Sequence, residues 1–203
     1  MELKAYGKSE KGLHLENQDS FLIDLEKSLF AVADGVTISN GDSRLASQAA
    51  ISALKGFSGD LEKSFEYINR KIKSIKNAGT TTLTAAFVKG SQLLVGHVGD
   101  SSLFLVHGKS AEKVTEDDSV EGSNVLSQVL GRGKPVIHLY KTMVKEGDVI
   151  ILATDGVAKY IEEKEILLAL KKNLGNVPNS LIEAARQKKK LYEDDKTVVV
   201  VAV

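Results

Sequence analysis

The chain has 203 residues, enough for one domain with a substantial core, and its 42% hydrophobic and 27% charged residues are typical of a soluble globular protein. Lys and Arg together number 27, as do Asp and Glu, so the net charge is zero and favours neither nucleic acid nor a membrane as partner. Because the chain has no cysteine, disulfides and thiolate metal sites are excluded.

The start of the chain is polar and lacks the apolar segment of a signal peptide. No apolar run reaches the ~20 residues that a membrane helix needs. The sequence also lacks internal repeats and linkers rich in Pro or Ser. We therefore expect a cytoplasmic protein in which residues 1–203 form a single domain.

The first part of the chain predicts two strands followed by two helices. Two apolar runs separated by a turn near Glu26 and Lys27 predict the strands. Apolar residues at helical spacing predict two amphipathic helices, the second with Asp60 as its N-cap. The expected ranges are 20–25 and 28–34 for the strands, and 42–57 and 60–76 for the helices.

The middle of the chain is rich in strand signals. Three apolar runs separated by turns that contain glycine predict an antiparallel meander. A short helix and a further strand are expected after it. The expected ranges are 79–90, 91–100 and 101–109 for the meander, 123–131 for the helix and 135–144 for the strand.

The last part of the chain predicts a buried strand, two helices and a final strand. Ser180 and Glu183 form a predicted capping box in the second helix. The succession of strands, helices, strands and helices indicates an α+β fold, which two antiparallel sheets covered by paired helices would accommodate. The expected ranges are 146–156 and 196–203 for the strands, and 162–173 and 179–190 for the helices.

Acidic residues recur where the predicted strands end. The runs FAVADGV and ILATDGV both end an apolar strand with Asp-Gly, and a carboxylate at the tip of a buried strand is costly unless something pairs with it. If these strand ends converge, the carboxylates form a cluster of oxygen ligands that suits Mg²⁺ or Mn²⁺. The alternative for each position is an ordinary turn, because Asp-Gly is a common turn dipeptide. The positions are Asp19, Asp34, Asp100, Asp155, Asp194 and Asp195.

The order of the motifs resembles one enzyme family. In chain order the motifs are ENQDSF, VADGV, GTTTLTAAF, LLVGHVGDSSLFLV, TEDDS, NVLSQVLG, GDVIILATDGV and DDKTVVVV. Together they resemble the protein phosphatase 2C family, the Mg²⁺/Mn²⁺-dependent Ser/Thr phosphatases, over the stretch from about Gly12 to Val203. The match is strongest to the short bacterial and archaeal type. The resemblance implies a four-layer αββα sandwich, two antiparallel sheets flanked by helix pairs, with a two-metal site at one end.

The resemblance also implies an activity and a set of metal ligands. The protein would hydrolyse phosphoserine and phosphothreonine in phosphorylated proteins through a water activated by two Mn²⁺ or Mg²⁺ ions, and a cognate Ser/Thr kinase would be a natural partner. Asp34 matches the aspartate that bridges the two ions, and Gly35 matches a carbonyl ligand. Asp155 and Asp194 match the remaining aspartate ligands. Asp100 matches a ligand of a third, weaker ion in bacterial members.

Other positions matter because they match the catalytic machinery or depart from it. Asp19 matches an aspartate that either binds a metal or supports a ligand, and with Asp34 it forms the predicted catalytic pair. His14 stands where the family has a phosphate-binding arginine; a protonated histidine would still contact phosphate, but without the bidentate fork. Lys159 stands where the family often has Asp, so a third metal would be poorly held, or the ammonium would partly replace it. Asp195 replaces an asparagine.

Two rival functions follow from the same residues. The loss of arginine at His14 favours a phosphatase-like pseudoenzyme that binds phosphoproteins without turnover, whereas the retained aspartates favour an enzyme. A phosphohydrolase of the haloacid dehalogenase type, built on VADGV, is the other rival. It would need a second aspartate where Val36 stands, and a parallel sheet that this order of strands does not indicate.

Overall fold

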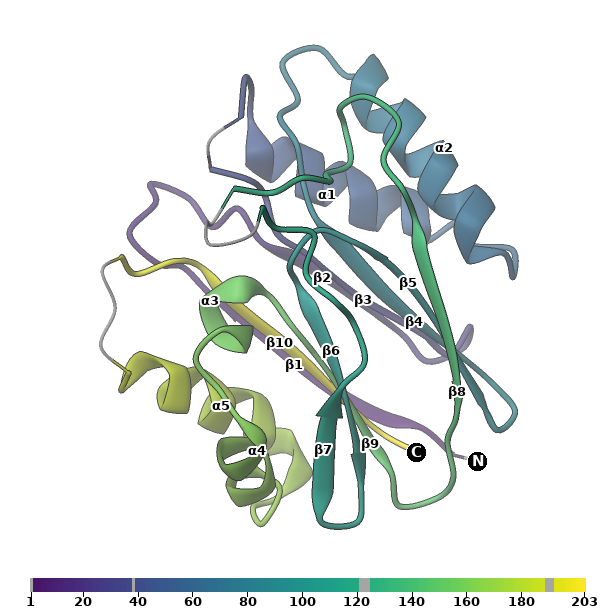
Figure 1. Cartoon of the computed structure of the whole chain (residues 1–203), viewed down its shortest axis with the longest axis vertical. Helices are drawn as coiled ribbons and strands as arrows, with labels where there is room; N and C mark the ends of the chain where they lie inside the picture. The colour runs from purple at the N-terminus through teal and green to yellow at the C-terminus, as the bar shows by residue number, and fades with distance from the viewer. Residues whose placement is uncertain (1, 38, 121–124, 189–191) are drawn as a thin grey trace.

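In the computed structural model, which describes residues 2–37, 39–120, 125–188 and 192–203, the strands form two five-stranded sheets (Figure 1). The first sheet contains, in spatial order, β1 (Lys4–Glu10), β10 (Lys196–Ala202), β9 (Val149–Ala153), β6 (Ser102–His107) and β7 (Ser110–Lys113). The second sheet contains β2 (Ser20–Asp24), β3 (Leu29–Ala33), β4 (Leu83–Lys89), β5 (Gln92–Val98) and β8 (His138–Met143). Every pairing between these strands is antiparallel, which excludes the parallel sheet of a haloacid-dehalogenase-type enzyme.

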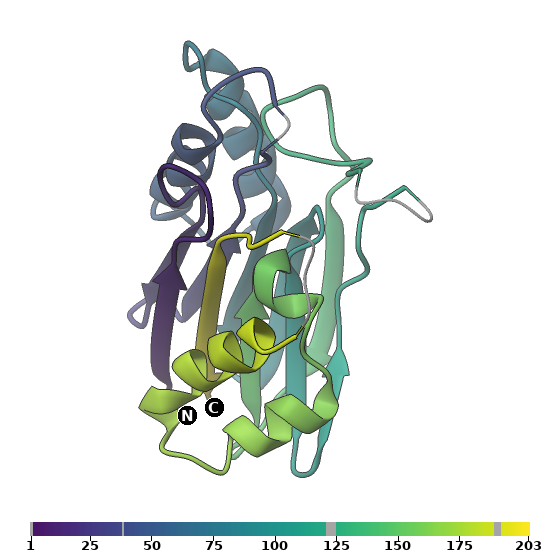
Figure 2. The ribbon, with the colours of Figure 1, turned by 90° about the vertical axis from the view of Figure 1, so that its left-hand side faces the viewer.

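Helices cover both outer faces of the two sheets. The helices are α1 (Ser43–Leu54), α2 (Leu61–Ser74), α3 (Asp155–Ala158), α4 (Glu163–Ala169) and α5 (Val177–Arg186), with the 3-10 turn η1 (Leu174–Asn176) before α5. The α1–α2 pair packs on the second sheet, and α3 to α5 pack on the first; in Figure 2 the α4–α5 pair faces the viewer. The predicted four-layer αββα sandwich is therefore confirmed.

Three clusters of buried apolar side chains lie between the four layers of the sandwich, and β3 contributes to two of them. Leu29, Ala31 and Ala33 pack among residues of α1 and α2, whereas Phe30 and Val32 pack against the first sheet. The alternation is that of any strand, but both faces are buried, so the strand has a continuous apolar sequence. The strand β10 alternates in the same way between the second sheet and the α4–α5 pair.

The first part of the chain folds as predicted. β2 and β3 form an antiparallel hairpin around residues 25–28. α1 and α2 lie within their expected ranges, and the Asp60 side chain caps α2 by accepting a hydrogen bond from the Lys63 backbone N–H at 3.0 Å.

The predicted three-stranded meander is wrong at its third strand. β4 pairs with β5, but β6 crosses to the first sheet, where it pairs with β7 and β9. Gly99 lies at the crossover with φ +108°, and a Cβ there would lie 2.5 Å from Thr82 Cγ2. Because these strands are apolar on both faces, the sequence pattern does not indicate which sheet a strand joins.

The predicted helix over 123–131 is also wrong. Residues 125–131 contain no helix, and residues 121–124 lie outside the described residues. The buried Leu130 instead exchanges two backbone hydrogen bonds with Thr81, at 2.9 and 3.1 Å. This pairing with a distant segment outweighs a weak local preference for helix. The strand expected at 135–144 is confirmed as β8.

The two strands and two helices expected in the last part of the chain are present, but α4 ends at Ala169 rather than 173, and α5 covers Val177–Arg186 rather than 179–190. This helix begins at Val177, with Pro178 in its first turn, where proline is favoured. The Ser180 hydroxyl donates to the Asn176 carbonyl at 2.9 Å, so the predicted capping box with Glu183 is wrong. Residues 189 and 190 of the expected helix lie outside the described residues.

The sequence did not predict β1, β7 or α3. β1 and β7 are the edge strands of the first sheet, and their mostly polar, partly exposed residues give little hydrophobic signal. Among the described residues, no helix has the length and hydrophobicity that a membrane span requires.

Candidate metal centre

One end of the sandwich carries a group of aspartates. Because neighbouring strands are antiparallel, the end of β3 lies beside the start of β2, and the end of β9 lies beside the start of β10. Four of the five aspartates stand at one of these strand ends or in the loop next to it, and the fifth stands in the loop between β5 and β6. The group consists of Asp19 before β2, Asp34 after β3, Asp100 between β5 and β6, Asp155 at the start of α3 and Asp194 before β10.

Asp19 connects the two sheets at this end. Its Oδ2 accepts hydrogen bonds from the hydroxyls of Thr154, at 2.8 Å, and Thr197, at 2.7 Å. The side chain is buried, and its Oδ1 has no hydrogen-bond partner among the described residues. Burial raises the pKa of Asp19 to about 8, against the effect of the two threonine hydrogen bonds and together with the charges of Asp195 and Asp155. Such a buried carboxylate is costly unless a cation lies beside it.

Asp34 is held through its backbone. Its N–H donates to Thr82 Oγ1 at 3.0 Å, and its carbonyl accepts from the Thr82 N–H and the Thr81 hydroxyl, both at 2.8 Å. The Thr82 hydroxyl also lies 2.8 Å from that of Ser101. Burial raises the pKa of Asp34 well above its usual value, and four neighbouring carboxylates raise it further. In order of effect these are Asp19, Asp155, Asp100 and Asp194.

Asp100 and Asp155 share one ammonium group. Lys159 Nζ lies 2.7 Å from Asp100 Oδ2 and 2.7 Å from Asp155 Oδ2. The second carboxylate oxygen of Asp155, Oδ1, is buried and has no hydrogen-bond partner among the described residues. Burial and the Asp155 charge raise the pKa of Asp100 to about 6, although Lys159 opposes them. Burial alone would lower the pKa of Lys159, but the two carboxylates outweigh it and raise the pKa.

Asp194 and Asp195 meet His14 at the edge of the group. His14 Nδ1 donates to Asp195 Oδ2 at 3.1 Å and lies 3.7 Å from Asp194 Oδ1, while Nε2 lies 3.0 Å from Thr37 Oγ1. Within the described residues, the ligand atoms of His14, Asp194 and Asp195 lie within 4.8 Å of one another. Burial, followed by the Asp155 charge, raises the pKa of Asp194.

Asp195 clamps the loop that carries His14. Besides the histidine, its carboxylate accepts the backbone N–H groups of Gly12 at 2.6 Å and Gln18 at 2.7 Å. The side chain is 2% exposed. The three hydrogen bonds use both carboxylate oxygens. An asparagine has only one acceptor oxygen, so it would not accept all three in this arrangement. The sequence indicated the substitution at this position but not this role.

The glycines of the two Asp-Gly pairs allow close packing of the backbone. A Cβ on Gly35 would lie 2.6 Å from the Ser43 carbonyl oxygen and 2.8 Å from that of Gln18. A Cβ on Gly156 would clash with the carbonyl oxygen of Asp195. The missing side chain of Gly156 therefore lets the segment that carries Asp194 lie against the start of α3.

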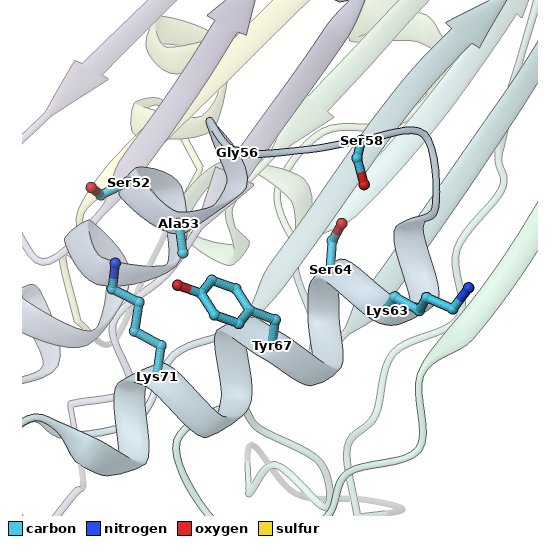
Figure 3. A pocket seen from close by; sticks show the side chains of 8 residues that line it. All are labelled: Ser52, Ala53, Gly56, Ser58, Lys63, Ser64, Tyr67 and Lys71. Atoms are coloured by element: carbon cyan, nitrogen blue, oxygen red, sulfur yellow. The ribbon is translucent and has the colours of Figure 1, made fainter.

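A separate cavity of about 420 Å³ lies between the end of α1 and α2 (Figure 3). Serines, Tyr67, Lys63 and Lys71 line it, and in Figure 3 the Lys63 ammonium points away from Tyr67 and Lys71. The Lys63 ammonium is paired with Asp60 at 3.1 Å. None of the aspartates at the strand ends lines this cavity, so it is separate from the candidate metal centre.

Comparison with known proteins places the chain in a family. A model of the protein phosphatase 2C family matches residues 6–193. The chain belongs to this family. The resemblance inferred from the order of the motifs is therefore confirmed.

Relatives in the phosphatase 2C family are moderately similar. The serine/threonine phosphatase stp of Listeria welshimeri is 26% identical over 170 residues, which cover 70% of this chain and 66% of that protein, slightly less than two thirds of its length. A structure of the phosphatase MsPP from Mycobacterium smegmatis, in complex with cacodylate, is 25% identical, with a TM-score of 0.83 over 98% of both chains. The catalytic domain of the phosphatase PstP, in complex with two manganese ions, is 26% identical, with a TM-score of 0.82 over 98% of this chain and 97% of that one.

The aspartates of this phosphatase 2C chain fit the divalent cations that the family implies. Carboxylate oxygens are hard ligands, which Mn²⁺ and Mg²⁺ prefer. Two of them, Asp19 Oδ1 and Asp155 Oδ1, are buried without a hydrogen-bond partner among the described residues. The pKa of Asp34 is raised by burial and by like charges, and the attraction of cations in the group would offset this rise.

Some contributors to the site gave little signal in the sequence. Thr154 and Thr197 orient Asp19 from the first sheet, and the Thr154 hydroxyl also accepts the Thr197 backbone N–H at 2.9 Å. Both threonines stand close to predicted ligands in the motifs TDG and DDKT, which is the only hint of their role. Their contact with Asp19 depends on how the two sheets pack together.

Proposed function

We propose that this protein is a metal-dependent phosphoprotein phosphatase that hydrolyses phosphoserine and phosphothreonine with a water activated by two Mn²⁺ or Mg²⁺ ions. The observation that carries the proposal is the convergence of five aspartates at one end of a phosphatase 2C fold, where two of their buried oxygens have no hydrogen-bond partner in the described part of the chain. The name of the Listeria relative, a serine/threonine phosphatase, supports the same activity.

In this proposal the aspartates divide between two cations. Asp34 would be held in common by both ions, since a shared carboxylate offsets the repulsion between two close positive charges. The Gly35 carbonyl would contribute to holding one ion, and Asp155 and Asp194 would contribute to holding the other. When bound, the two cations would lower the pKa of a shared water towards neutrality and stabilise charge on the phosphoryl oxygens.

Asp19 would act from a fixed position beside these ligands. The two threonine hydroxyls hold its Oδ2, and none of the described residues donates a hydrogen bond to its Oδ1. We propose that Oδ1 binds an ion directly or accepts a proton of the attacking water. Either role needs the carboxylate to be ionised, and the nearby cations would bring its raised pKa down.

His14 is the proposed contact to the substrate phosphate. Asp195 holds its Nδ1, so the ring can present Nε2, which now lies beside the Thr37 hydroxyl. A phosphate oxygen would replace that hydroxyl as the partner of Nε2. The substrates would be phosphorylated proteins, and a cognate Ser/Thr kinase and a cytoplasmic location stay predictions.

The test is hydrolysis of p-nitrophenyl phosphate and of a phosphothreonine peptide with added Mn²⁺. We expect activity that EDTA abolishes and that Asp34→Asn lowers by at least a hundredfold, because the bridging charge is lost. Asp60→Asn is the matched control, since asparagine caps a helix as well as aspartate does, and should keep full activity. Equal activity of Asp34→Asn and Asp60→Asn would contradict the proposal.

A pseudoenzyme that binds phosphoproteins is the second candidate. It is favoured by His14, which replaces an arginine and whose two ring nitrogens both lie beside protein partners. Purified protein that stays inert on both substrates with Mn²⁺, yet binds the phosphothreonine peptide, would support this candidate. Turnover of either substrate that depends on Asp34 would exclude it.

A further inference from the structure

The contact between Lys159 and two site aspartates supports an inference that rests on the proposed two-metal centre. Lys159 follows the last residue of α3 and stands four residues after Asp155, so the two side chains lie on the same side of this short helix. Its backbone N–H also donates to the Asp155 carbonyl at 3.3 Å. The position of the ammonium is thus set locally by the helix turn that begins with Asp155.

The ammonium lies between two carboxylates that come from different parts of the chain. Its distances to Asp100 Oδ2 and Asp155 Oδ2 are equal, at 2.7 Å. The Asp100 side chain is 6% exposed and that of Asp155 is 19% exposed, so water screens this contact only partly. A divalent cation shared by Asp100 and Asp155 would need the space that the ammonium fills.

We propose that the Lys159 ammonium is a permanent cation in place of a third divalent ion, and that it orients Asp155 for the two-metal centre. The ammonium engages Oδ2 of Asp155, which leaves the buried Oδ1, without a hydrogen-bond partner among the residues that the structure describes, as the oxygen available to a metal ion. The protein therefore binds two divalent ions, and the charge at the Asp100 side does not depend on the metal concentration. Lys159 is in this sense a positioning residue, because it acts through Asp155.

The proposal is tested by counting bound Mn²⁺ rather than by activity alone. Isothermal titration and equilibrium dialysis of the wild-type protein should give two Mn²⁺ ions per chain, and three would overturn the proposal. Lys159→Asp should bind a third ion, because it adds a carboxylate where a charge of the opposite sign stood. Lys159→Arg should keep two, because the positive charge is retained. A Lys159→Asp variant that folds and still binds two ions would also overturn the proposal.

A second measurement covers the case in which Lys159→Asp fails to fold. Lys159→Met keeps the length of the side chain but removes its charge, so Asp100 and Asp155 lose their cation. We expect millimolar Mn²⁺ to raise the melting temperature of Lys159→Met by at least twice as much as that of the wild type. An equal rise in both proteins would overturn the proposal.

The outcomes separate this proposal from the proposed phosphatase activity. If the wild type binds two Mn²⁺ ions but hydrolyses no phosphate ester, the proposed role of Lys159 stands and the proposed phosphatase activity is wrong. If the wild type binds three ions and is active, the proposed role of Lys159 is wrong and the proposed activity stands. Wild type that binds no Mn²⁺ would overturn both.

Discussion

The buried aspartates predict that the metal-free protein loses stability as the pH rises. The folded state holds a proton on Asp19, whose pKa is about 8, whereas the unfolded state has released it above the ordinary value of 3.8. Unfolding therefore releases a proton between these values, and the free energy of unfolding falls as the pH rises towards 8. Binding of divalent cations would remove the dependence, because they replace the proton as the partner of the carboxylate.

The expected size follows from the pKa of Asp19. A full proton difference changes the free energy of unfolding by about 1.4 kcal/mol for each pH unit. The folded state itself loses about half of this proton between pH 6.5 and 8, so the fall in the free energy of unfolding is somewhat smaller than for a full proton difference. We expect a fall of about 1.5 kcal/mol, or roughly 5 °C in melting temperature for a chain of this size. The raised pKa of Asp34 acts in the same direction. Burial lowers the pKa of His97, and this acts mainly below pH 6.5, outside the chosen range.

Thermal unfolding in EDTA and in excess Mn²⁺, at several pH values from 6.5 to 8, measures this effect. In EDTA the melting temperature should fall with pH, and the increase caused by Mn²⁺ should be larger at pH 8 than at pH 6.5. Asp19→Asn is the control, because an amide oxygen can still accept from Thr154 and Thr197 but does not titrate. A melting temperature in EDTA that rises with pH, or an equal slope in Asp19→Asn, would refute the reasoning.

Two further substitutions test the packing and the phosphate contact. Gly156→Ala should destabilise the protein by about 2 kcal/mol, since its Cβ would clash with the Asp195 carbonyl. Gly56→Ala is the control: the nearest atom to its Cβ would lie at 3.4 Å, so stability should change by less than about 0.5 kcal/mol. Urea unfolding measures both, and equal values would contradict the packing argument. His14→Arg should lower KM for p-nitrophenyl phosphate by about tenfold at similar kcat, because a guanidinium offers a bidentate contact. An unchanged KM in steady-state kinetics would show that residue 14 does not bind phosphate.

Much of the fold was predictable because its central strands are apolar throughout. The runs that form β3, β9 and β10 are buried on both faces, and this gives them the strongest hydrophobic signal in the chain. The same property hid the partner of each strand, so β6 was expected beside β5 and lies beside β9 instead. Edge strands gave the opposite problem, since β1 is mostly polar and its pairing with β10 supplies its stability.

The candidate site was predictable only as a list of residues. The Asp-Gly pairs and their order along the chain identified the aspartates, because a carboxylate at a buried strand end needs a partner. Their arrangement depends on contacts between the sheets, such as the two hydroxyls that reach Asp19 from the first sheet. The contact of Lys159 with both carboxylates was also not predictable in full. Its spacing from Asp155 is local, but Asp100 lies 59 residues away along the chain.

The sequence by itself determined the layered α+β architecture, the family and the identity of the acidic residues, because hydrophobic period, turn chemistry and motif order are properties of neighbouring residues. The tertiary structure decided which oxygens are held and which are free. One carboxylate oxygen of Asp19 is held by distant threonines, and one of Asp155 is held by Lys159. The other oxygen of each is buried and has no hydrogen-bond partner among the described residues. That division depends on the packing of one sheet against the other, which no local pattern in the chain encodes.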